Sequence, residues 1–333
     1  QGFASLCGLV ECDWEGAEAS EQLPARFVVK IPSALPFRKL NDSLPAGQRM
    51  LNGDEAMWEM MEGKLREVHD VEVATYEFFE SFDGLEIPKM YYGIPYGKED
   101  STCGQIALEF VENSRMMNFH ENHSVEQVRQ VARALGKIQA CSLKKEPTAV
   151  ELQKNFFEDF AKTITMEAWC GMYKAVTFLD SSEETAVLSA KIDHLLPDYY
   201  ASSLPTTIHK QFGIRPVLVN GDLRTENVLI DCETGNLASL IDWQCTHLGV
   251  AVEDLIRISL FALTPEERRA SAPMLIAEMY NSLVANLGGD EPPYTLEMCF
   301  THSMYIDIQL RELYDLLFPH LGLYFAGGCI MMI

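Results

Sequence analysis

The chain has 333 residues, of which 49 are Asp or Glu and 26 are Lys or Arg, so its formal net charge is −23. A surface this acidic repels the phosphates of nucleic acids, and no cluster of Lys and Arg reverses the sign, so we expect no nucleic acid among its partners. Hydrophobic residues at 47% exclude a disordered chain, and at roughly 100–200 residues per domain the length indicates two domains or lobes.

The cysteines and the two chain ends indicate a cytoplasmic protein. The nine cysteines form no C-x-x-C pair and no zinc pattern with the histidines, which favours a reducing compartment. The start at Gln1 has no signal-peptide core and is typical of a chain cut inside a domain. Residues 316–333 are apolar, but Pro319, Gly327 and Gly328 interrupt them, so we expect a buried terminal helix and no membrane among the partners.

The patterns of the first part of the chain predict four strands and one long helix. Short apolar runs at 4–11 and 26–31, separated by a turn-rich stretch, predict an antiparallel pair that ends near Lys30. Two further runs, 87–93 and 105–111, predict strands on either side of a region with Gly and Pro. Between these pairs, apolar side chains recur at helical spacing from residue 54 to 82, at Met57, Met61, Leu65, Val68, Val71, Thr75, Phe78 and Phe82.

The second part of the chain is predicted to be mainly helical. Ser124 and Gln127 form a capping box at the start of a helix, and the helical pattern continues to about residue 210. Strands first and helices later indicate an α+β fold with a strand-rich first lobe, a short hinge and a helical second lobe. The predicted boundaries are 1–112 for the first lobe, 109–112 for the hinge and 113–333 for the second lobe.

One segment, residues 216–243, departs from the helical pattern. Residues 216–220 predict a strand, and 228–231 with 237–241 predict a hairpin around a Gly- and Asn-containing turn. After Trp243 the pattern predicts helices again. The second lobe is therefore expected to contain one hairpin among its helices.

Three polar residues are expected to meet at the open end of this hairpin. Asn227 directly precedes its first strand and Asp242 directly follows its second, so antiparallel pairing brings them together. Asp222 lies on the loop just before Asn227 and reaches the same end. Two carboxylates and an amide oxygen suit Mg²⁺, which takes few protein oxygens beside water and substrate phosphates.

These residues carry a resemblance to a known family. The segments 220–227 (NGDLRTEN) and 241–244 (IDWQ) resemble the catalytic and metal-binding motifs of the aminoglycoside phosphotransferase and choline kinase group, which has a two-lobed protein-kinase-like fold. The chain is most similar to the CHK-kinase-like, or ecdysteroid-kinase-like, family and to its nematode branch. Two positions depart from the family pattern, because Asn220 stands where the family usually has His and Arg224 where it has Trp.

The resemblance implies roles in the second lobe for these side chains. Asp222 would be the general base for a substrate hydroxyl. Asn227 and Asp242 would hold Mg²⁺ that bridges the phosphates of ATP. Asp254 would accept hydrogen bonds from the catalytic loop as a structural brace.

The resemblance also implies roles in the first lobe. Lys30 would contact the α- and β-phosphates of ATP and pair with an acidic residue of the long helix, for which we choose Glu72 and leave Glu67 and Glu77 open. The remaining positions implied for the nucleotide are the backbone groups of Glu109 and Val111 at the adenine and the segment from Gly2 to Ser5 over the phosphates.

The implied function is an ATP- and Mg²⁺-dependent kinase that phosphorylates a hydroxyl of a small molecule, such as a steroid-like, choline-like or other alcohol. The alternative is a catalytically inactive pseudokinase that binds nucleotide or a small ligand, which Asn220 and the shortened start favour. A dinucleotide oxidoreductase is excluded because no G-x-G-x-x-G follows a strand.

Overall fold

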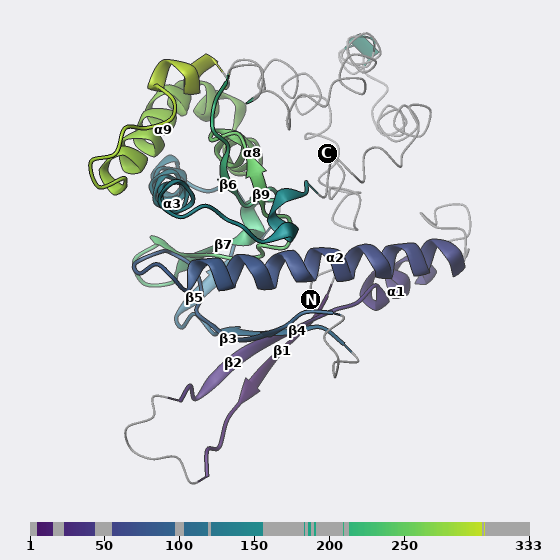
Figure 1. The fold of residues 1–333 in the computed structure, drawn as a ribbon. Coiled ribbons are helices and arrows are strands. Elements are labelled where there is room, and N and C mark those ends of the chain that lie inside the picture. Colours follow the sequence, from purple (N-terminus) through teal and green to yellow (C-terminus); the bar gives the residue numbers. More distant parts are fainter. Residues whose placement is uncertain are drawn as a thin grey trace.

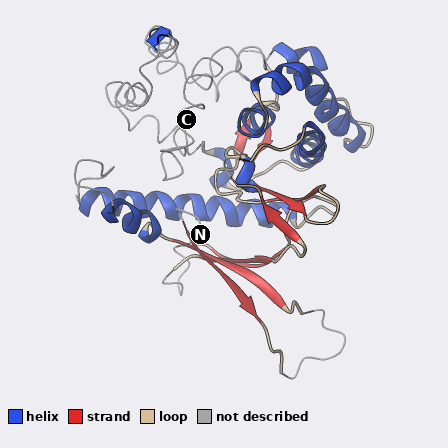
Figure 2. Cartoon of the chain, turned by 180° about the vertical axis from the view of Figure 1, so that it is seen from behind, coloured by secondary structure: helices blue, strands red, loops and turns tan. Residues whose placement is uncertain are grey.

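The structure is a computed structural model that describes residues 5–15, 23–43, 55–96, 103–118, 121–155 and 213–301, with the single positions 183, 186, 187, 190, 209 and 303. These residues form the expected α+β fold in two lobes: a four-stranded sheet on one side and a mainly helical part on the other (Figure 1). The long helix α2 (Glu55–Phe79) runs between the two parts in both views (Figures 1 and 2).

The sheet of the first lobe is antiparallel throughout, in the order β1-β2-β4-β3. The predicted pairing of the first two strands is confirmed, and it places Cys7 opposite Lys30. The four strands are β1 (Ser5–Glu11), β2 (Arg26–Pro32), β3 (Met90–Ile94) and β4 (Gln105–Glu109).

Helix α2 buries the apolar face that its sequence predicts. The side chains from that face that the structure buries are Leu65, Val68, Val71, Thr75 and Phe78. A second helix, α1 (Leu35–Ser43), was not predicted from the sequence. It packs Phe37 edge-on against Trp58 of α2, with ring centroids 5.8 Å apart, so this tertiary contact stabilises a helix too short to show a clear period.

The second lobe contains more strands than predicted. The hairpin of β7 (Val228–Asp231) and β8 (Leu237–Leu240) is confirmed, and β5 (Ser114–Met116) extends it to three strands. The strand β6 (Val217–Val219) pairs with β9 (His247–Gly249), where the sequence predicted a direct return to helices after Trp243. Strands of three residues carry no readable alternation, and distant backbone partners create them.

The helices of this lobe begin at side-chain caps where the sequence offers them. The helix α3 (Val125–Lys144) has the predicted capping box of Ser124 and Gln127. It is followed by α8 (Glu253–Ala262) and α9 (Pro265–Asn286), the latter capped by Thr264.

Two predicted helical stretches fall largely outside the described residues. Up to Asn155 the predicted helical stretch contains only a loop and a short 3₁₀ helix, Val150–Gln153, after α3, and most of it lies beyond. The predicted terminal helix at 316–333 also lies outside. Within the part that the structure describes, no helix has the length and apolar character needed to cross a membrane.

Helices α3 and α9 are in close contact because Gly136 has no side chain. A Cβ at this position would collide with the backbone oxygen of Met279 and with Ser282. The Ser282 hydroxyl donates to the Arg133 carbonyl at 2.7 Å, and Arg133 forms an ion pair with Glu278 at 2.5 Å. This contact supports α8 and the strands beside it.

We expect Gly136→Ala to lower the free energy of unfolding by about 1–3 kcal/mol, because an added methyl must push the two helices apart. Gly63→Ala is the matched control, since Gly63 lies in α2 and a Cβ there has nothing within 4 Å. The control should be neutral or stabilising by up to about 1 kcal/mol through helix propensity. Urea unfolding measures both, and equal effects would contradict this packing.

Strand β9 is tied to α8 by a buried histidine. The Nδ1 of His247 donates to the Cys245 carbonyl at 3.0 Å, and its Nε2 lies 3.3 Å from the Glu253 carboxylate and 2.9 Å from the Asn155 amide. Burial alone would lower the pKa of His247, but Glu253 raises it above 6.5. The ion pair therefore holds α8 against β9.

We expect the stability difference between the wild-type protein and His247→Gln to shrink as the pH rises. The folded pKa of His247 lies above its unfolded value of about 6.5, so its stabilisation is fully present below that pH and is lost as the pH rises through the folded pKa. Unfolding by urea at a series of pH values above about 5, where Glu253 stays ionised, measures this difference.

The control is His69→Gln. Burial lowers the pKa of His69, so its contribution should change with pH in the opposite direction. A pH-independent effect of His247→Gln would mean that no charged pair with Glu253 exists.

Candidate active site

A lysine joins the two lobes at the centre of the structure. The ammonium of Lys30 on β2 lies 2.7 Å from the carboxylate of Glu72 on α2 and 2.6 Å from that of Asp242, which follows β8. The other two acidic residues considered from the sequence lie elsewhere, because Glu67 pairs with Lys64 and Glu77 is exposed. The structure thus brings Lys30, Glu72 and Asp242 together.

The burial of this group makes its charges interdependent. The side chains of Lys30 and Glu72 are 12% and 1% exposed, whereas Asp242 is 24% exposed. Burial alone would lower the pKa of Lys30, but Asp242 and then Glu72 raise it. Burial raises the pKa of Glu72, and Lys30 opposes this rise. With both carboxylates ionised, the group carries one excess negative charge.

Helix α8 anchors the loop 220–227 through the side chain of Asp254. The Asp254 carboxylate accepts hydrogen bonds from the backbone N–H groups of Asn220 at 2.6 Å and Gly221 at 2.9 Å. Gly221 has a φ of +81°, and a Cβ there would collide with the Cys245 carbonyl oxygen, so only glycine fits. Burial raises the pKa of Asp254 to about 6.

Two side-chain amides hold this loop against the hairpin. The Asn220 side chain donates to the Asp242 carbonyl at 3.0 Å and accepts from the Asp222 N–H at 3.1 Å. The Asn227 side chain donates to the Asp222 carbonyl at 2.8 Å, and the Ile241 N–H donates to the Asn227 carbonyl at 3.0 Å. Asp222, Asn227 and Asp242 therefore gather at the open end of the hairpin, as their places in the sequence predict.

The backbone at Asp242 is held in a strained conformation. Its φ of +62° lies in the left-handed region, which non-glycine residues seldom adopt. The next residue, Trp243, is fully buried, stacks edge-on against Phe79 of α2 at 4.9 Å and donates to the Leu240 carbonyl at 3.2 Å. This anchorage fixes the direction of the Asp242 carboxylate toward Lys30.

Asp222 is a buried carboxylate without close donors. It is 1% exposed, and among the described residues neither of its oxygens accepts a hydrogen bond. Arg224 and Arg257 approach its two oxygens to 3.9 Å each. Burial raises the pKa of Asp222 to about 6, and the two arginines oppose the rise. A carboxyl group in this state exchanges a proton near neutral pH.

Of the two predicted hinge positions, Glu109 is the last residue of β4 and Val111 follows two residues later. The Glu109 N–H donates to the Lys89 carbonyl at 2.8 Å, and the Lys89 N–H donates to the Glu109 carboxylate at 3.0 Å. The Val111 carbonyl accepts the Ser114 hydroxyl at 2.7 Å.

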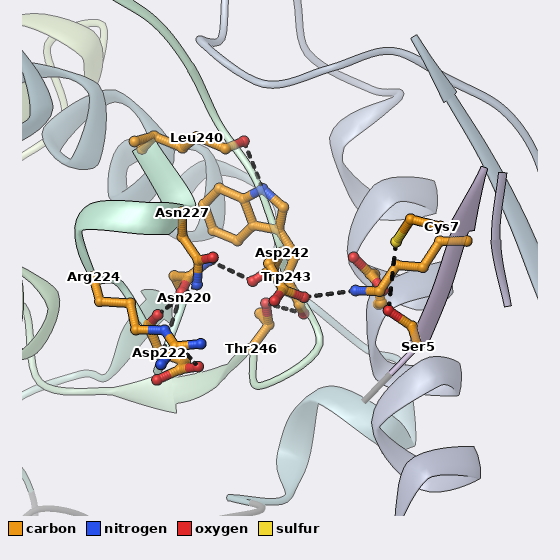
Figure 3. A network of polar contacts seen from close by, with 12 residues as sticks. Ser5, Cys7, Asn220, Asp222, Arg224, Asn227, Leu240, Asp242, Trp243 and Thr246 are labelled. Carbon is orange, nitrogen blue, oxygen red and sulfur yellow. Dashed lines mark hydrogen bonds and ion pairs between the residues drawn. The ribbon is translucent and has the colours of Figure 1, made fainter. Parts of the chain in front are cut away.

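The amino-terminal segment is described only in part, because Gly2 lies outside the described residues. Ser5 opens β1 opposite Pro32 of β2 and is buried. Its hydroxyl lies 3.5 Å from the Cys7 thiol (Figure 3).

The donor set fits Mg²⁺ only as a site shared with phosphates and water. Within the described residues no three His, Cys, Asp or Glu side chains gather as a metal site. Among the described residues, Asn227 bonds Asp222 through its amide nitrogen and Asp242 bonds Lys30 through one oxygen, so the Asn227 amide oxygen and the second Asp242 oxygen can face a metal ion. One carboxylate and one amide, beside an excess negative charge, match the few protein ligands that Mg²⁺ takes with nucleotide phosphates.

One residue of this group was not found from the sequence. Arg257 lies on α8 one helical turn after Asp254, and it reaches the oxygen of Asp222 that Arg224 leaves free. The three-residue step from Asp254 was the available signal, because it puts Arg257 on the face of α8 that meets the loop.

One family model and two curated relatives match the chain. Residues 1–330 match the model of the family DUF1679, which is described as "Uncharacterized oxidoreductase dhs-27". The "Uncharacterized kinase-like protein D1044.1" of Caenorhabditis elegans is 25% identical over 223 residues, which are 66% of this chain and 57% of that protein. The "Uncharacterized oxidoreductase dhs-27" of the same organism is 22% identical over 268 residues, 78% of this chain and 32% of that protein.

Two of the solved structures that the chain is similar to are named as a phosphotransferase and a kinase. The macrolide 2′-phosphotransferase MphH of Brachybacterium faecium is 14% identical, with 91% of this chain and 83% of that chain covered and a TM-score of 0.42. A microcompartment-associated aminopropanol kinase is 12% identical, with 93% of each chain covered and a TM-score of 0.40. The match over residues 1–330 decides the family: the chain belongs to DUF1679, the nematode kinase-like family that its motifs resemble.

Proposed function

We propose that the protein is a phosphotransferase that uses ATP and Mg²⁺ to phosphorylate a hydroxyl of a small molecule. The observation that carries this proposal is the grouping of Lys30, Asn227 and Asp242 beside Asp222, a buried carboxylate whose oxygens accept no hydrogen bond from the described residues. A surface cluster of charges would be solvated, whereas this one is held by Lys30 of β2, Glu72 of α2 and Asp254 of α8. The kinase-like name of one relative agrees with it.

The residues divide between the nucleotide and the acceptor. Lys30 would bind the α- and β-phosphates, and Glu72 keeps its ammonium in place from the buried side. Asn227 and Asp242 would hold Mg²⁺, which when bound neutralises charge on the phosphates. The backbone of Glu109 and Val111 would face adenine, and Ser5 with the preceding residues would cover the phosphates.

Asp222 would act on the acceptor. It accepts the proton of the substrate hydroxyl while that oxygen forms its bond to the γ-phosphorus, and the bond from this phosphorus to the bridging oxygen breaks as ADP leaves. Most of the rate would come from positioning and charge neutralisation. The raised pKa of Asp222, about 6, leaves it ionised at neutral pH and able to take up the proton.

The alternative, a pseudokinase, depends on Asn220. The Asn220 side chain donates to the Asp242 carbonyl and accepts from the Asp222 N–H, so a brace is present where the family usually has His. This favours the enzyme. Calorimetry of ATP with and without Mg²⁺ tests both, because absence of binding in the presence of Mg²⁺ would exclude the kinase and the nucleotide-binding pseudokinase alike.

We expect Asp242→Asn and Asp222→Asn to affect different steps. Loss of the Asp242 charge should weaken binding of Mg²⁺ and nucleotide tenfold or more, on the order of 1.4 kcal/mol. Asp222→Asn should keep nucleotide affinity within about threefold and lower phosphate transfer about 100-fold or more, the usual effect of a general base. Calorimetry and single-turnover transfer measure the two steps. The reverse pattern would exchange the two roles.

We expect Asn220→His to change transfer by less than about tenfold, because a neutral imidazole also has one donor and one acceptor. Asn220→Leu is the matched control of similar size. It leaves the Asp222 N–H and the Asp242 carbonyl unpaired at about 1–3 kcal/mol each, so it should lower transfer far more. Single-turnover transfer from ATP to a panel of alcohols is the measurement. Activity that appears only with His would make the natural protein a pseudokinase.

A further inference from the structure

Two arginines flank the carboxylate that would receive the acceptor hydroxyl. Arg224, from the loop itself, lies 3.9 Å from one oxygen of Asp222, and Arg257, from α8, lies 3.9 Å from the other. Their side chains are 21% and 14% exposed. At this distance the charges attract, but no hydrogen bond forms, because N–H···O bonds end near 3.2 Å.

One buried donor of Arg224 is without a hydrogen-bond partner among the described residues. This donor is the Nε, and its second carboxylate neighbour, Glu226, is also 4.0 Å away. A guanidinium has five N–H donors and no acceptor, and buried donors without partners are costly. An oxyanion that enters beside Asp222 would satisfy them.

A neutral alcohol gives no reason for this arrangement. Such an acceptor needs the carboxylate alone, and a neutral group gains nothing from the two positive charges that lie 3.9 Å from the carboxylate oxygens. An anionic acceptor does need them, since it must approach Asp222 and Glu226 in a chain of net charge −23. Guanidinium groups offset that repulsion and bind oxyanions through paired hydrogen bonds.

The position of Arg224 favours the acceptor over the nucleotide. Within the described residues its ion pairs are with Asp222 and Glu226, and it makes none with Asp242, beside which the nucleotide phosphates would lie. A hydroxyl hydrogen-bonded to Asp222 and an oxyanion hydrogen-bonded to Arg224 would then lie only a few bonds apart in one small molecule.

We propose that the acceptor is an anionic alcohol, with a carboxylate or phosphate close to the reacting hydroxyl, and that Arg224 is the residue that selects this charge. The inference rests on the proposed function, because it uses Asp222 as the site of the hydroxyl. It extends that function from alcohols in general to hydroxy acids and alcohol phosphates.

The test measures acceptor binding separately from transfer. Calorimetry with ADP and Mg²⁺ present compares each anion with its neutral partner: glycerate, malate and mandelate with their methyl esters, and glycerol phosphate with glycerol. The wild-type protein should bind at least one anion about tenfold more tightly than its neutral partner, and the carboxylate and phosphate pairs show which anion it prefers. Arg224→Gln should remove this preference, and Arg224→Lys should keep part of it.

The controls separate charge selection from general damage. Arg269→Gln makes the same charge change on the exposed side of α9, where Arg269 pairs only with Glu266 among the described residues, and it should leave the preference unchanged. Thermal unfolding of each variant checks that the fold is kept. If Arg224→Gln fails to fold, the loss or retention of preference in Arg224→Lys and in Arg224→Met decides the role.

Three results would overturn the inference. The first is wild-type protein that binds no anion of the panel, or that binds the neutral partners as tightly as the anions. The others are an anion preference that survives Arg224→Gln, and a loss of ADP affinity in Arg224→Gln as large as its loss of anion affinity. The last result would assign Arg224 to the nucleotide.

Phosphate transfer to the same panel tests the proposed function by itself. Anion preference without transfer would refute the kinase and keep the anion site, whereas transfer to neutral alcohols without preference would do the reverse.

Discussion

The ammonium of Lys30 is the point on which the rest of the site depends. It bonds Glu72 at 2.7 Å and Asp242 at 2.6 Å, and so connects β2, the long helix α2 and the end of the β7–β8 hairpin. Removing one partner from such a buried group costs about 3–5 kcal/mol, because the others are left as uncompensated charges. One cation therefore ties the two lobes together and, with the anchorage of Trp243, holds the Asp242 carboxylate in its direction.

The loop 220–227 is constrained from the other side by groups that have no access to water. Asp254 receives two backbone N–H groups, and Asn220 reaches both Asp222 and Asp242. The left-handed backbone at Asp242 costs about 1–3 kcal/mol, and the buried Trp243 beside it makes any relaxation still more costly. Rigid supports of this kind position a base and a metal ligand without further adjustment on binding.

Much of this arrangement was readable from the sequence because it rests on local signals. The hairpin could be predicted from its turn and its β-branched residues, and the convergence of Asp222, Asn227 and Asp242 followed from antiparallel pairing. The choice of Glu72 came from the resemblance, which left Glu67 and Glu77 open. The functional roles of these residues remain predictions, and the geometry agrees with them.

The parts that escaped prediction depend on contacts between distant segments. Helix α1 exists because Phe37 meets Trp58, and β5 and β9 exist because strands far along the chain pair with them. The approach of Arg257 to Asp222 is of the same kind, because it needs α8 to lie beneath the loop. For α1, β5 and β9 no local pattern specifies the distant partner, and the spacing of Arg257 from Asp254 indicates only the face of α8 on which it lies.

The distribution of charge links these observations to chemistry. In a chain with 23 more acidic than basic charges, chance would surround a carboxylate mostly with other carboxylates. Yet Lys30 lies between Glu72 and Asp242, and Arg224 and Arg257 flank Asp222, so the cations gather at the buried carboxylates.

Buried carboxylates stay ionised only when cations or a metal compensate them. Lys30 alone leaves Glu72 and Asp242 with one uncompensated negative charge, which favours a divalent cation there. Asp222 already has two cations beside it, and their excess positive charge attracts an anion. The site therefore attracts a cation at one end and an anion at the other, as transfer of a phosphoryl group from a metal-bound nucleotide to an anionic acceptor would require.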